Sequence, residues 1–155
     1  MASDKQGQRN KLNKKDIVKV GLRIPLMQTA MNYERMQADG WTLAMAPALK
    51  KIYGDDEEGL ANALTANLQF MNTNNYAAPV LMGLLLSLEE NGEERSTIDG
   101  LRIALFGPLA GIGDAITWFT ILPIVAGITA SFAKEGSFLG PLIFFLVFLS
   151  LFFAR

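Results

Sequence analysis

Three polar side chains in the first third of the chain have the types and spacing to bind a hydroxyl-rich ligand. Asn32, Glu34 and Gln37 lie within one six-residue segment. A carboxylate accepts hydrogen bonds and an amide both donates and accepts them, which suits the hydroxyl groups of a sugar. Glu34 also continues an apolar stripe at three- and four-residue steps, so we expect it to be paired, protonated or facing a wet cavity. A packing role, in which Glu34 pairs with Arg35 or a lysine, is equally compatible with the sequence.

A second polar cluster, Asn72–Asn75, could contribute to the same kind of site. Asn72 and Thr73 supply an amide and a hydroxyl, and both groups suit a polyol. Clusters of asparagine and threonine are more often turns that end a helix. We therefore predict a turn here, and we also regard Asn72 and Thr73 as candidate sugar-binding residues.

The segment Gly107–Asp114 places a proline, three glycines and a carboxylate in an apolar stretch. Proline and glycine are unfavourable inside a helix, so this pattern predicts a broken helix. Broken backbone at membrane depth is found where protein or a water-filled cavity satisfies its polar groups, as in transporters. We expect a broken-helix element formed by Gly107, Gly111, Gly113 and Asp114. For Asp114 the two interpretations are a functional acid within the membrane and the N-cap of the next helix.

The chain contains no cysteine and no histidine. Disulfides, zinc sites, cysteine nucleophiles and histidine bases are therefore excluded. A nucleophile–base pair that uses either residue is excluded, and only chemistry by carboxylates alone stays open. We therefore predict no catalytic residue, no metal site and no cofactor. A phosphohistidine or phosphocysteine is excluded as well. Any phosphoryl transfer linked to this chain must therefore take place on a partner.

The apolar pattern predicts several short helices around the two polar clusters. Apolar side chains at helical spacing predict an amphipathic helix from Asp16, which Pro25 should kink or split and Gly40 should end. A short helix should follow over Trp41–Lys51. The acidic segment Asp55–Glu58 resembles a capping box and should start the next helix. The apolar stripe of that helix comprises Leu60, Leu64, Leu68 and Met71.

Three longer apolar segments predict an all-α integral membrane protein. Ala77–Leu88 is too short to span a bilayer and suits a re-entrant or buried helix. An acidic loop, Glu89–Asp99, and the glycine-rich segment follow, and then come two candidate spanning helices, Ala115–Ala133 and Phe138–Ala154. The predicted fold class comprises amphipathic N-terminal helices, re-entrant or broken helices and about two spanning segments. A soluble turn at the glycine-rich segment fits less well, because the residues after it are so apolar.

Charge is unevenly distributed along the chain, although the net charge is only −1. Residues 1–15 are polar and basic and should form a mobile tail, followed by one domain over residues 16–155. Taken alone, the basic start could indicate nucleic acid or an anionic lipid surface. It lacks interleaved aromatic residues, so we expect no nucleic-acid partner. The positive-inside rule then places the N-terminus in the cytoplasm.

Three motifs resemble, in order and spacing, the IID membrane component of mannose-family phosphotransferase systems. They are Asn32–Gln37, Leu68–Thr73 and Gly107–Asp114. Pro47–Tyr53 and Gly140–Phe145 agree with the same family pattern, and the resemblance covers residues 16–155. Leu101–Phe106 and Trp118–Ile124 look most like the N-acetylgalactosamine branch of the family.

This resemblance implies a multi-pass subunit that pairs with a IIC subunit in the bacterial cytoplasmic membrane, as part of a hetero-oligomer. Together the two subunits would carry a hexose or amino sugar inward, while the IIA and IIB subunits phosphorylate it with phosphate from phosphoenolpyruvate. The absence of histidine and cysteine agrees with this division of labour, because IID is not the phosphoryl carrier. We expect the glycine-rich element to let the sugar site change access.

The chain departs from the family pattern in two respects. Asn67 and Asn74 occupy places where family members usually have a histidine, and Asn75 replaces a common proline. These differences bear on substrate preference rather than on the fold. The chain is also about half as long as a typical IID protein and resembles its N-terminal half. The alternative function is therefore a truncated or split IID fragment that binds IIC without transporting.

Overall fold

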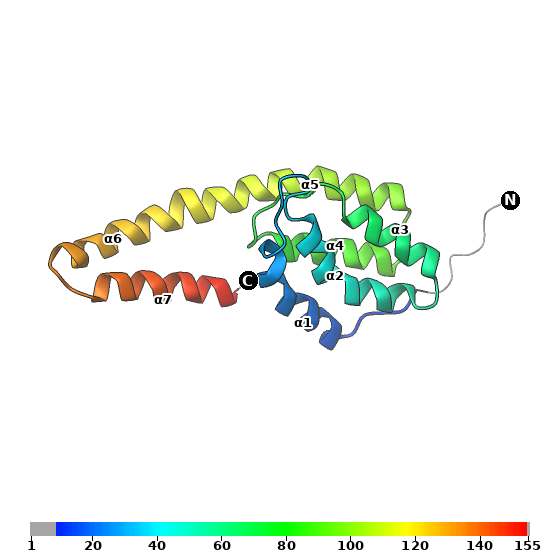
Figure 1. Cartoon of the computed structure of the whole chain (residues 1–155), viewed down its shortest axis with the longest axis horizontal. Helices are drawn as coiled ribbons and strands as arrows, with labels where there is room; N and C mark the ends of the chain where they lie inside the picture. Colours follow the sequence, from blue (N-terminus) through cyan, green and yellow to red (C-terminus); the bar gives the residue numbers. More distant parts are fainter. Residues whose placement is uncertain (1–8, 155) are drawn as a thin grey trace. The chain divides into compact units, whose positions relative to one another are not determined.

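The computed structural model describes residues 9–154 of the chain. Every regular element in that range is a helix, in the order shown in Figure 1. The chain divides after Ala110 into two compact units. The prediction of an all-α protein is confirmed for the described residues.

The first unit is built around one central helix. Its elements are α1 (Lys14–Arg23), the 3-10 helix η1 (Ile24–Gln28), α2 (Ala38–Tyr53), α3 (Glu57–Asn67), α4 (Ala78–Glu90) and the beginning of α5 (Arg95–Ile116). Helix α2 packs against α1, η1, α3 and α4. Its side chains Trp41, Met45 and Leu49 are fully buried, as are Leu81 and Leu85 of α4. Burying each of these large apolar side chains contributes about 1.5–3 kcal/mol relative to exposure.

Pro25 splits the first predicted helix, as expected. Helix α1 is capped by Asn13, whose side chain accepts hydrogen bonds from the first turn. It ends at Arg23, and η1 carries Pro25 near its start, where the missing amide proton does no harm. No helix covers residues 29–37, so the predicted continuation of the first helix to Gly40 is wrong. Residues 29–37 instead form a loop of turns and isolated bridges.

Gly40 has a packing role in place of the predicted helix-ending role. It lies in the first turn of α2, and a Cβ atom there would lie 2.0 Å from the carbonyl oxygen of Met27. The absence of a side chain therefore lets η1 cross α2 in direct backbone contact. This contact fixes where the loop that follows η1 begins.

The predicted cap of the third helix is displaced by one residue. Asp56 is the N-cap of α3, and its side chain accepts a hydrogen bond from the backbone N–H of Gly59. The helix ends at Asn67, so Met71 lies beyond it and is buried in the core through the following segment. The short helix predicted from residue 77 is confirmed as α4, and its face with Ala78, Leu81 and Leu85 is buried.

The segment before α1 is held against the helices. The backbone N–H of Asn10 donates to the carbonyl of Ile52 at 3.0 Å. The Arg9 guanidinium lies 2.8 Å from the Asp56 carboxylate. These contacts place residues 9–13 on the first unit rather than in the predicted tail, whereas residues 1–8 lie outside the described residues.

The second unit is a helical hairpin. It contains a π-helical segment, η2 (Thr117–Ile121), then α6 (Leu122–Lys134) and α7 (Leu139–Ala154). Gly136 turns the chain with φ 73°. Helices α6 and α7 pack closely where a Cβ on Gly140 would lie 2.5 Å from the carbonyl oxygen of Thr129. Small residues at such a crossing allow helices to approach in an apolar environment.

One continuous helical stretch among the described residues is long and apolar enough to cross a membrane. It covers the 40 residues Arg95–Lys134, and only 11% of its most apolar window is buried within the chain. Helix α7 is more apolar than α5 or α6 but has only 16 residues. The prediction of an apolar C-terminal part is thus confirmed, with one full-length candidate span where we expected about two.

Candidate functional site

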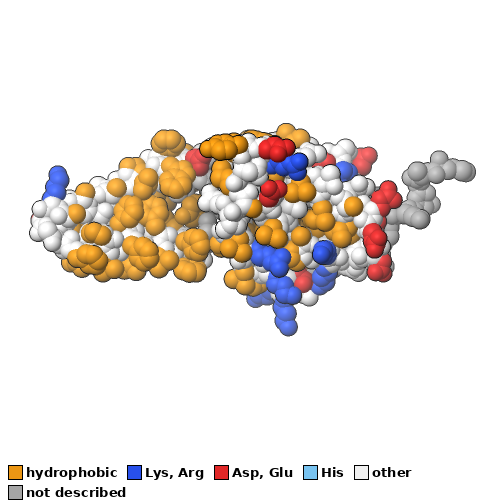
Figure 2. Space-filling view, in the orientation of Figure 1, with side chains coloured by type: hydrophobic (Ala, Val, Ile, Leu, Met, Phe, Trp, Pro, Cys, Tyr) orange, Lys and Arg blue, Asp and Glu red, His pale blue; other side chains and the backbone are white. Residues whose placement is uncertain are grey.

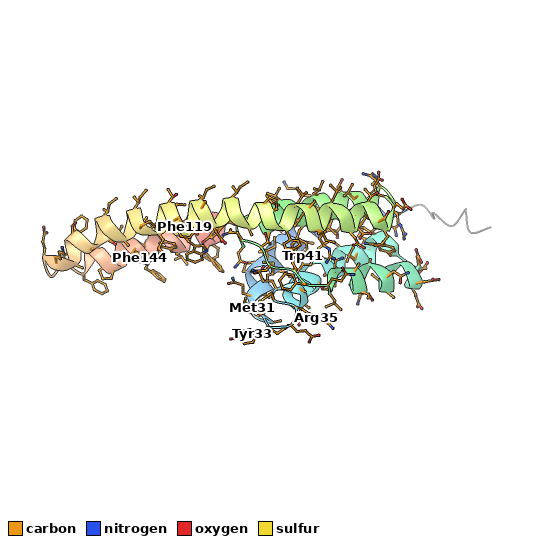
Figure 3. The ribbon with its side chains drawn as sticks, turned by 90° about the horizontal axis from the view of Figure 1, so that it is seen from above. Met31, Tyr33, Arg35, Trp41, Phe119 and Phe144 are labelled. Atoms are coloured by element: carbon orange, nitrogen blue, oxygen red, sulfur yellow. The ribbon has the colours of Figure 1, made fainter. Side chains whose placement is uncertain are left out.

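The two polar clusters predicted from the sequence lie side by side. The backbone N–H of Gln37 donates to the carbonyl of Met71 at 2.9 Å, and the N–H of Met71 donates to the carbonyl of Arg35 at 3.3 Å. Segments 32–37 and 71–73 are thereby joined in the first unit. In Figure 3, Met31, Tyr33 and Arg35 lie together at the edge of this unit. We call residues 31–37 together with 71–73 the paired loops.

Gln37 and Thr73 hold the paired loops together from inside. Both residues are buried. The Gln37 side-chain oxygen accepts a hydrogen bond from the Thr73 backbone N–H at 2.9 Å. The Thr73 hydroxyl donates to the carbonyl of Phe106 in α5 at 3.1 Å. The structure thus brings these two candidate residues together, and their polar groups fix the backbone of the paired loops.

Asn32 shapes the first of the paired loops. Its side-chain oxygen accepts hydrogen bonds from the backbone N–H groups of Glu34 at 3.0 Å and Arg35 at 2.8 Å. Its amide nitrogen donates to the Asp39 carboxylate at 2.7 Å. Met36 closes the turn with a φ of 54°, a conformation that non-glycine residues rarely adopt. Such local strain persists only where the surroundings hold it, and it is found often at ligand sites.

Glu34 is not on a buried helix face. The helix predicted through this position is absent, and the side chain is 81% exposed at the tip of the first loop. Asn32 accounts for the difference, because its side chain bonds to the two following backbone N–H groups and so competes with helix formation. The Arg35 guanidinium lies 3.7 Å from the Glu34 carboxylate. An exposed ion pair of this length contributes little to stability, so Glu34 is available to a ligand.

Tyr33 is a candidate that the sequence did not single out. It is 99% exposed, and it borders a pocket of about 290 Å³ with Met31, Asn32 and Met36. An exposed aromatic ring beside polar groups can present its apolar face to the carbon skeleton of a sugar. The sequence did offer one indication of this role, because Tyr33 lies between Asn32 and Glu34 in the first polar cluster. Asn72 is exposed on the second of the paired loops.

The second cluster also forms the turn that we predicted as its structural role. The Asn74 side-chain oxygen accepts the backbone N–H of Tyr76 at 2.8 Å, and its carbonyl accepts the N–H of Ala78 at 2.9 Å. These bonds lead the chain from the paired loops into α4. The turn and the candidate ligand-facing role of Asn72 are therefore compatible.

The break predicted at Gly107–Asp114 is absent. Helix α5 runs through Pro108 and all three glycines to Ile116. In apolar surroundings an unpaired backbone group costs more than a helical glycine, so the intrahelical hydrogen bonds are kept. Asp114 consequently lies inside α5 and is not the N-cap of a following helix. Apart from the chain neighbours and the backbone of the helix itself, no described atom lies within 4 Å of a Cβ built on Gly107 or Gly111.

The irregularity in this helical stretch lies just beyond the glycines. Residues Thr117–Ile121 form a π-helical turn, in which the Thr120 hydroxyl donates to the carbonyl of Ala115 at 2.9 Å. Single π-helical turns inside α-helices occur often at functional sites. The sequence predicted an irregular helix at Gly107–Asp114, and the irregular turn lies a few residues later, at Thr117–Ile121.

A buried polar cluster joins α2, α4 and α5 in the first unit. Glu89 is 2% exposed and accepts a hydrogen bond from the Tyr53 hydroxyl at 2.5 Å. The Arg95 guanidinium donates to both Glu89 carboxylate oxygens, at 2.7 and 2.9 Å. Burial, and then the hydrogen bond and the charge of Glu89, raise the pKa of Tyr53 to about 12. The sequence placed Glu89 in an exposed acidic loop, but α4 continues to Glu90 and buries it.

The comparisons with known proteins agree on one family. Residues 11–155 match the family model of the mannose/fructose/sorbose family IID component of the phosphotransferase system. The mannose-specific EIID component of Escherichia coli K12 is 43% identical over 143 residues, which is 89% of this chain and 50% of that protein. The fructose permease IID component of Bacillus subtilis is 37% identical over 140 residues, covering 87% of this chain and 50% of that protein.

The fold is also similar to solved membrane-protein structures. A chain from a cryo-EM structure of the mannose transporter ManYZ with a microcin aligns with a TM-score of 0.86 and 41% identity. That alignment covers 94% of this chain and 55% of the other chain. The chain therefore spans about half the length of the curated relatives and solved structures that it matches.

Proposed function

The chain belongs to the mannose/fructose/sorbose family of phosphotransferase-system IID components, and we propose that it contributes to sugar uptake together with a IIC subunit. The complex would carry a hexose or amino sugar across the bacterial cytoplasmic membrane, and IIA and IIB would phosphorylate the sugar. The single observation that carries this proposal is the pairing of segments 32–37 and 71–73, which brings the predicted sugar-binding residues together.

Within this site the residues have two kinds of role. Asn32, Gln37 and Thr73 use their polar groups to hold the loops. Glu34 and Asn72 are exposed and would accept and donate hydrogen bonds to sugar hydroxyls. The ring of Tyr33 would cover one apolar face of the sugar. Because the exposed residues lie on the outer side of the paired loops, the sugar would bind there, over the pocket beside Met36.

The glycines of α5 are proposed to make the site mobile. Gly107, Gly111 and Gly113 weaken the helix by about 1 kcal/mol each relative to alanine. Asp114 and the π-helical turn follow directly. A helix weakened in this way could bend as the site changes access. The sugar is N-acetylgalactosamine or mannose in this proposal. The first choice follows the resemblance of Leu101–Phe106 and Trp118–Ile124, and the second follows the mannose-specific relative.

The proposed topology is a multi-pass membrane protein with a cytoplasmic N-terminus. Its support is the apolar helical stretch Arg95–Lys134, followed by the apolar helix α7. Basic side chains near the start favour the cytoplasmic side. The second candidate function is a fragment that binds IIC without transporting. The chain spans about half the length of the relatives that it matches.

The test uses cells that lack their own IID but contain IIA, IIB and IIC. Uptake of labelled N-acetylgalactosamine and of mannose is measured with and without this chain, and IIC is purified through an affinity tag. Restored uptake of either sugar supports the proposal. Co-purification with IIC without uptake of either sugar supports the fragment alternative. The absence of both uptake and co-purification would contradict both functions.

A further inference from the structure

Helix α1 presents an apolar face that the first unit leaves uncovered. Ile17 and Val18 are each 50% exposed and Leu22 is 73% exposed. Together with Gly21 they occupy an arc of about 140° on a helix of 3.6 residues per turn. A soluble helix normally turns such an arc toward the core. Here the arc faces away from it.

The orientation of α1 is fixed by contacts on its other side. Val20 is buried in the core of the first unit. The Lys51 ammonium lies 2.5 Å from the Asp16 carboxylate, which carries a lowered pKa because of this hydrogen bond. The exposed apolar arc is therefore held outward by the fold, and a small rotation of the helix could not bury it.

Basic side chains border the exposed arc. Lys15 and Lys19 follow Leu22 around the helix. Lys14 falls within the arc at the first turn of the helix, where a long side chain can extend past its apolar neighbours. All three lysines are exposed. Figure 2 shows the blue side chains gathered over this part of the first unit, whereas acidic side chains gather elsewhere on the same face. An exposed apolar strip bordered by lysines is the pattern of a helix that lies in a membrane interface.

We propose that α1 is an interfacial helix that docks on the anionic headgroup surface of the bilayer. Ile17, Val18 and Leu22 enter the boundary between headgroups and acyl chains, and the lysines contact lipid phosphates. This inference rests on the proposed membrane location and adds a second, peripheral contact with the same bilayer. Nucleic acid would use the lysines but leave the apolar arc in water, and a protein partner would bury the arc without any dependence on lipid charge.

The chain contains no cysteine, so single cysteines report one position each. Leu22→Cys is labelled with an environment-sensitive fluorophore in the full chain and reconstituted into vesicles of zwitterionic lipid, with or without phosphatidylglycerol. Quenching by lipid-borne bromine and by aqueous iodide is compared. Phe145→Cys on α7 reports membrane insertion, and Glu58→Cys on α3 reports exposure to water. Both native residues are exposed on the chain.

We expect the Leu22 label to be quenched by the brominated lipid and shielded from iodide, with both effects stronger in the anionic vesicles. Because a lysine near an anionic surface favours binding about fivefold, Lys14→Gln/Lys15→Gln/Lys19→Gln should abolish the gain from phosphatidylglycerol. The control Lys50→Gln, on the exposed side of α2, should retain it.

The proposal would be overturned if iodide quenched the label at position 22 as strongly as it quenches the label at position 58. A label shielded from both quenchers, which indicates a protein partner, would also overturn it, as would lipid quenching that does not respond to phosphatidylglycerol. A Phe145 label that lipid fails to quench would contradict the membrane location itself. The two failures are therefore distinguishable.

Discussion

At the scale of single residues, the candidate site separates side chains that hold the loops from side chains that face outward. Gln37 and Thr73 are buried and bonded across the paired loops. Glu34 and Tyr33 are exposed at the tip of the first loop. Substitution of the first pair should therefore affect stability, and substitution of the second pair should affect ligand binding with little effect on the fold.

Gln37→Met should destabilise the chain. Methionine fills a similar volume but cannot accept the Thr73 N–H, and an unsatisfied buried donor costs about 1–3 kcal/mol. Thermal unfolding in detergent would measure the loss. The control Asn72→Ala removes an exposed amide from the same pair of loops and should change stability by about 0.5 kcal/mol or less. Equal effects of the two substitutions would show that Gln37 does not hold the loops.

Tyr53→Phe should lower stability at neutral pH and remove a pH dependence at high pH. Folding raises the pKa of Tyr53 from 10.0 to about 12. The folded state therefore keeps the hydroxyl proton where the unfolded state loses it, and the stabilisation from Tyr53 is complete below pH 10 and is lost as the pH rises toward 12. Unfolding curves from pH 8 to 12 would show this decline in the natural chain. The same decline in Tyr53→Phe would contradict the assignment.

The sequence identified the two polar clusters but not how the fold surrounds them. It offered Gln37 and Thr73 as separate candidates, and the fold brings them together. The exposure of Glu34 did not follow from the sequence, because its spacing fits a helical stripe and the side-chain bonds of Asn32 override that pattern. The burial of Glu89 could not be predicted either, since its partners Tyr53 and Arg95 lie on other helices.

At the scale of elements, the close backbone contact between η1 and α2 fixes the position at which the first of the paired loops begins. Gly40→Ala should destabilise the first unit by more than the helix propensity of alanine could offset, because the new Cβ would lie 2.0 Å from the Met27 carbonyl oxygen. The matched control is Gly83→Ala on α4, where no atom outside the neighbouring backbone of the helix itself lies within 4 Å of the new atom. That substitution should stabilise the helix by about 0.5–1 kcal/mol.

Thermal unfolding of both variants measures the contrast. A Gly40→Ala chain as stable as Gly83→Ala would show that η1 and α2 can separate without cost. That outcome would also remove the structural reason for the start of the paired loops. An intact fold with lowered stability is the expected result for Gly40→Ala.

The elements that the sequence predicted well are those with a single dominant signal. Pro25 ended a helix, and the apolar run after residue 77 formed a short buried helix, as expected. The continuous path of α5 through Pro108 was not predicted, because local propensity favours a break. The apolar setting of that helix reverses the local preference, and a propensity argument does not include it.

At the scale of the whole molecule, the chain combines a folded helical unit with an apolar hairpin. The first unit has its own core around Trp41 and Met45. The second unit leaves large apolar side chains exposed, including Phe119 in η2, Phe138 between α6 and α7, and Phe153 in α7. Exposed surface of this kind requires lipid or a partner subunit. This agrees with the proposed membrane location of the chain.

The central claim is that the paired loops bind the transported sugar, and uptake by matched variants tests it most directly. Sugar uptake is measured in cells with IIA, IIB and IIC that express this chain, Glu34→Gln, Tyr33→Ala or the control Glu58→Gln at equal membrane abundance. We predict uptake reduced at least about tenfold for Glu34→Gln, equivalent to about 1.4 kcal/mol. Tyr33→Ala should impair uptake and Tyr33→Phe should retain it, because the proposed contact with the sugar is made by the ring. Glu58→Gln should match the natural chain. Uptake by Glu34→Gln and Tyr33→Ala equal to that of the natural chain would contradict the account.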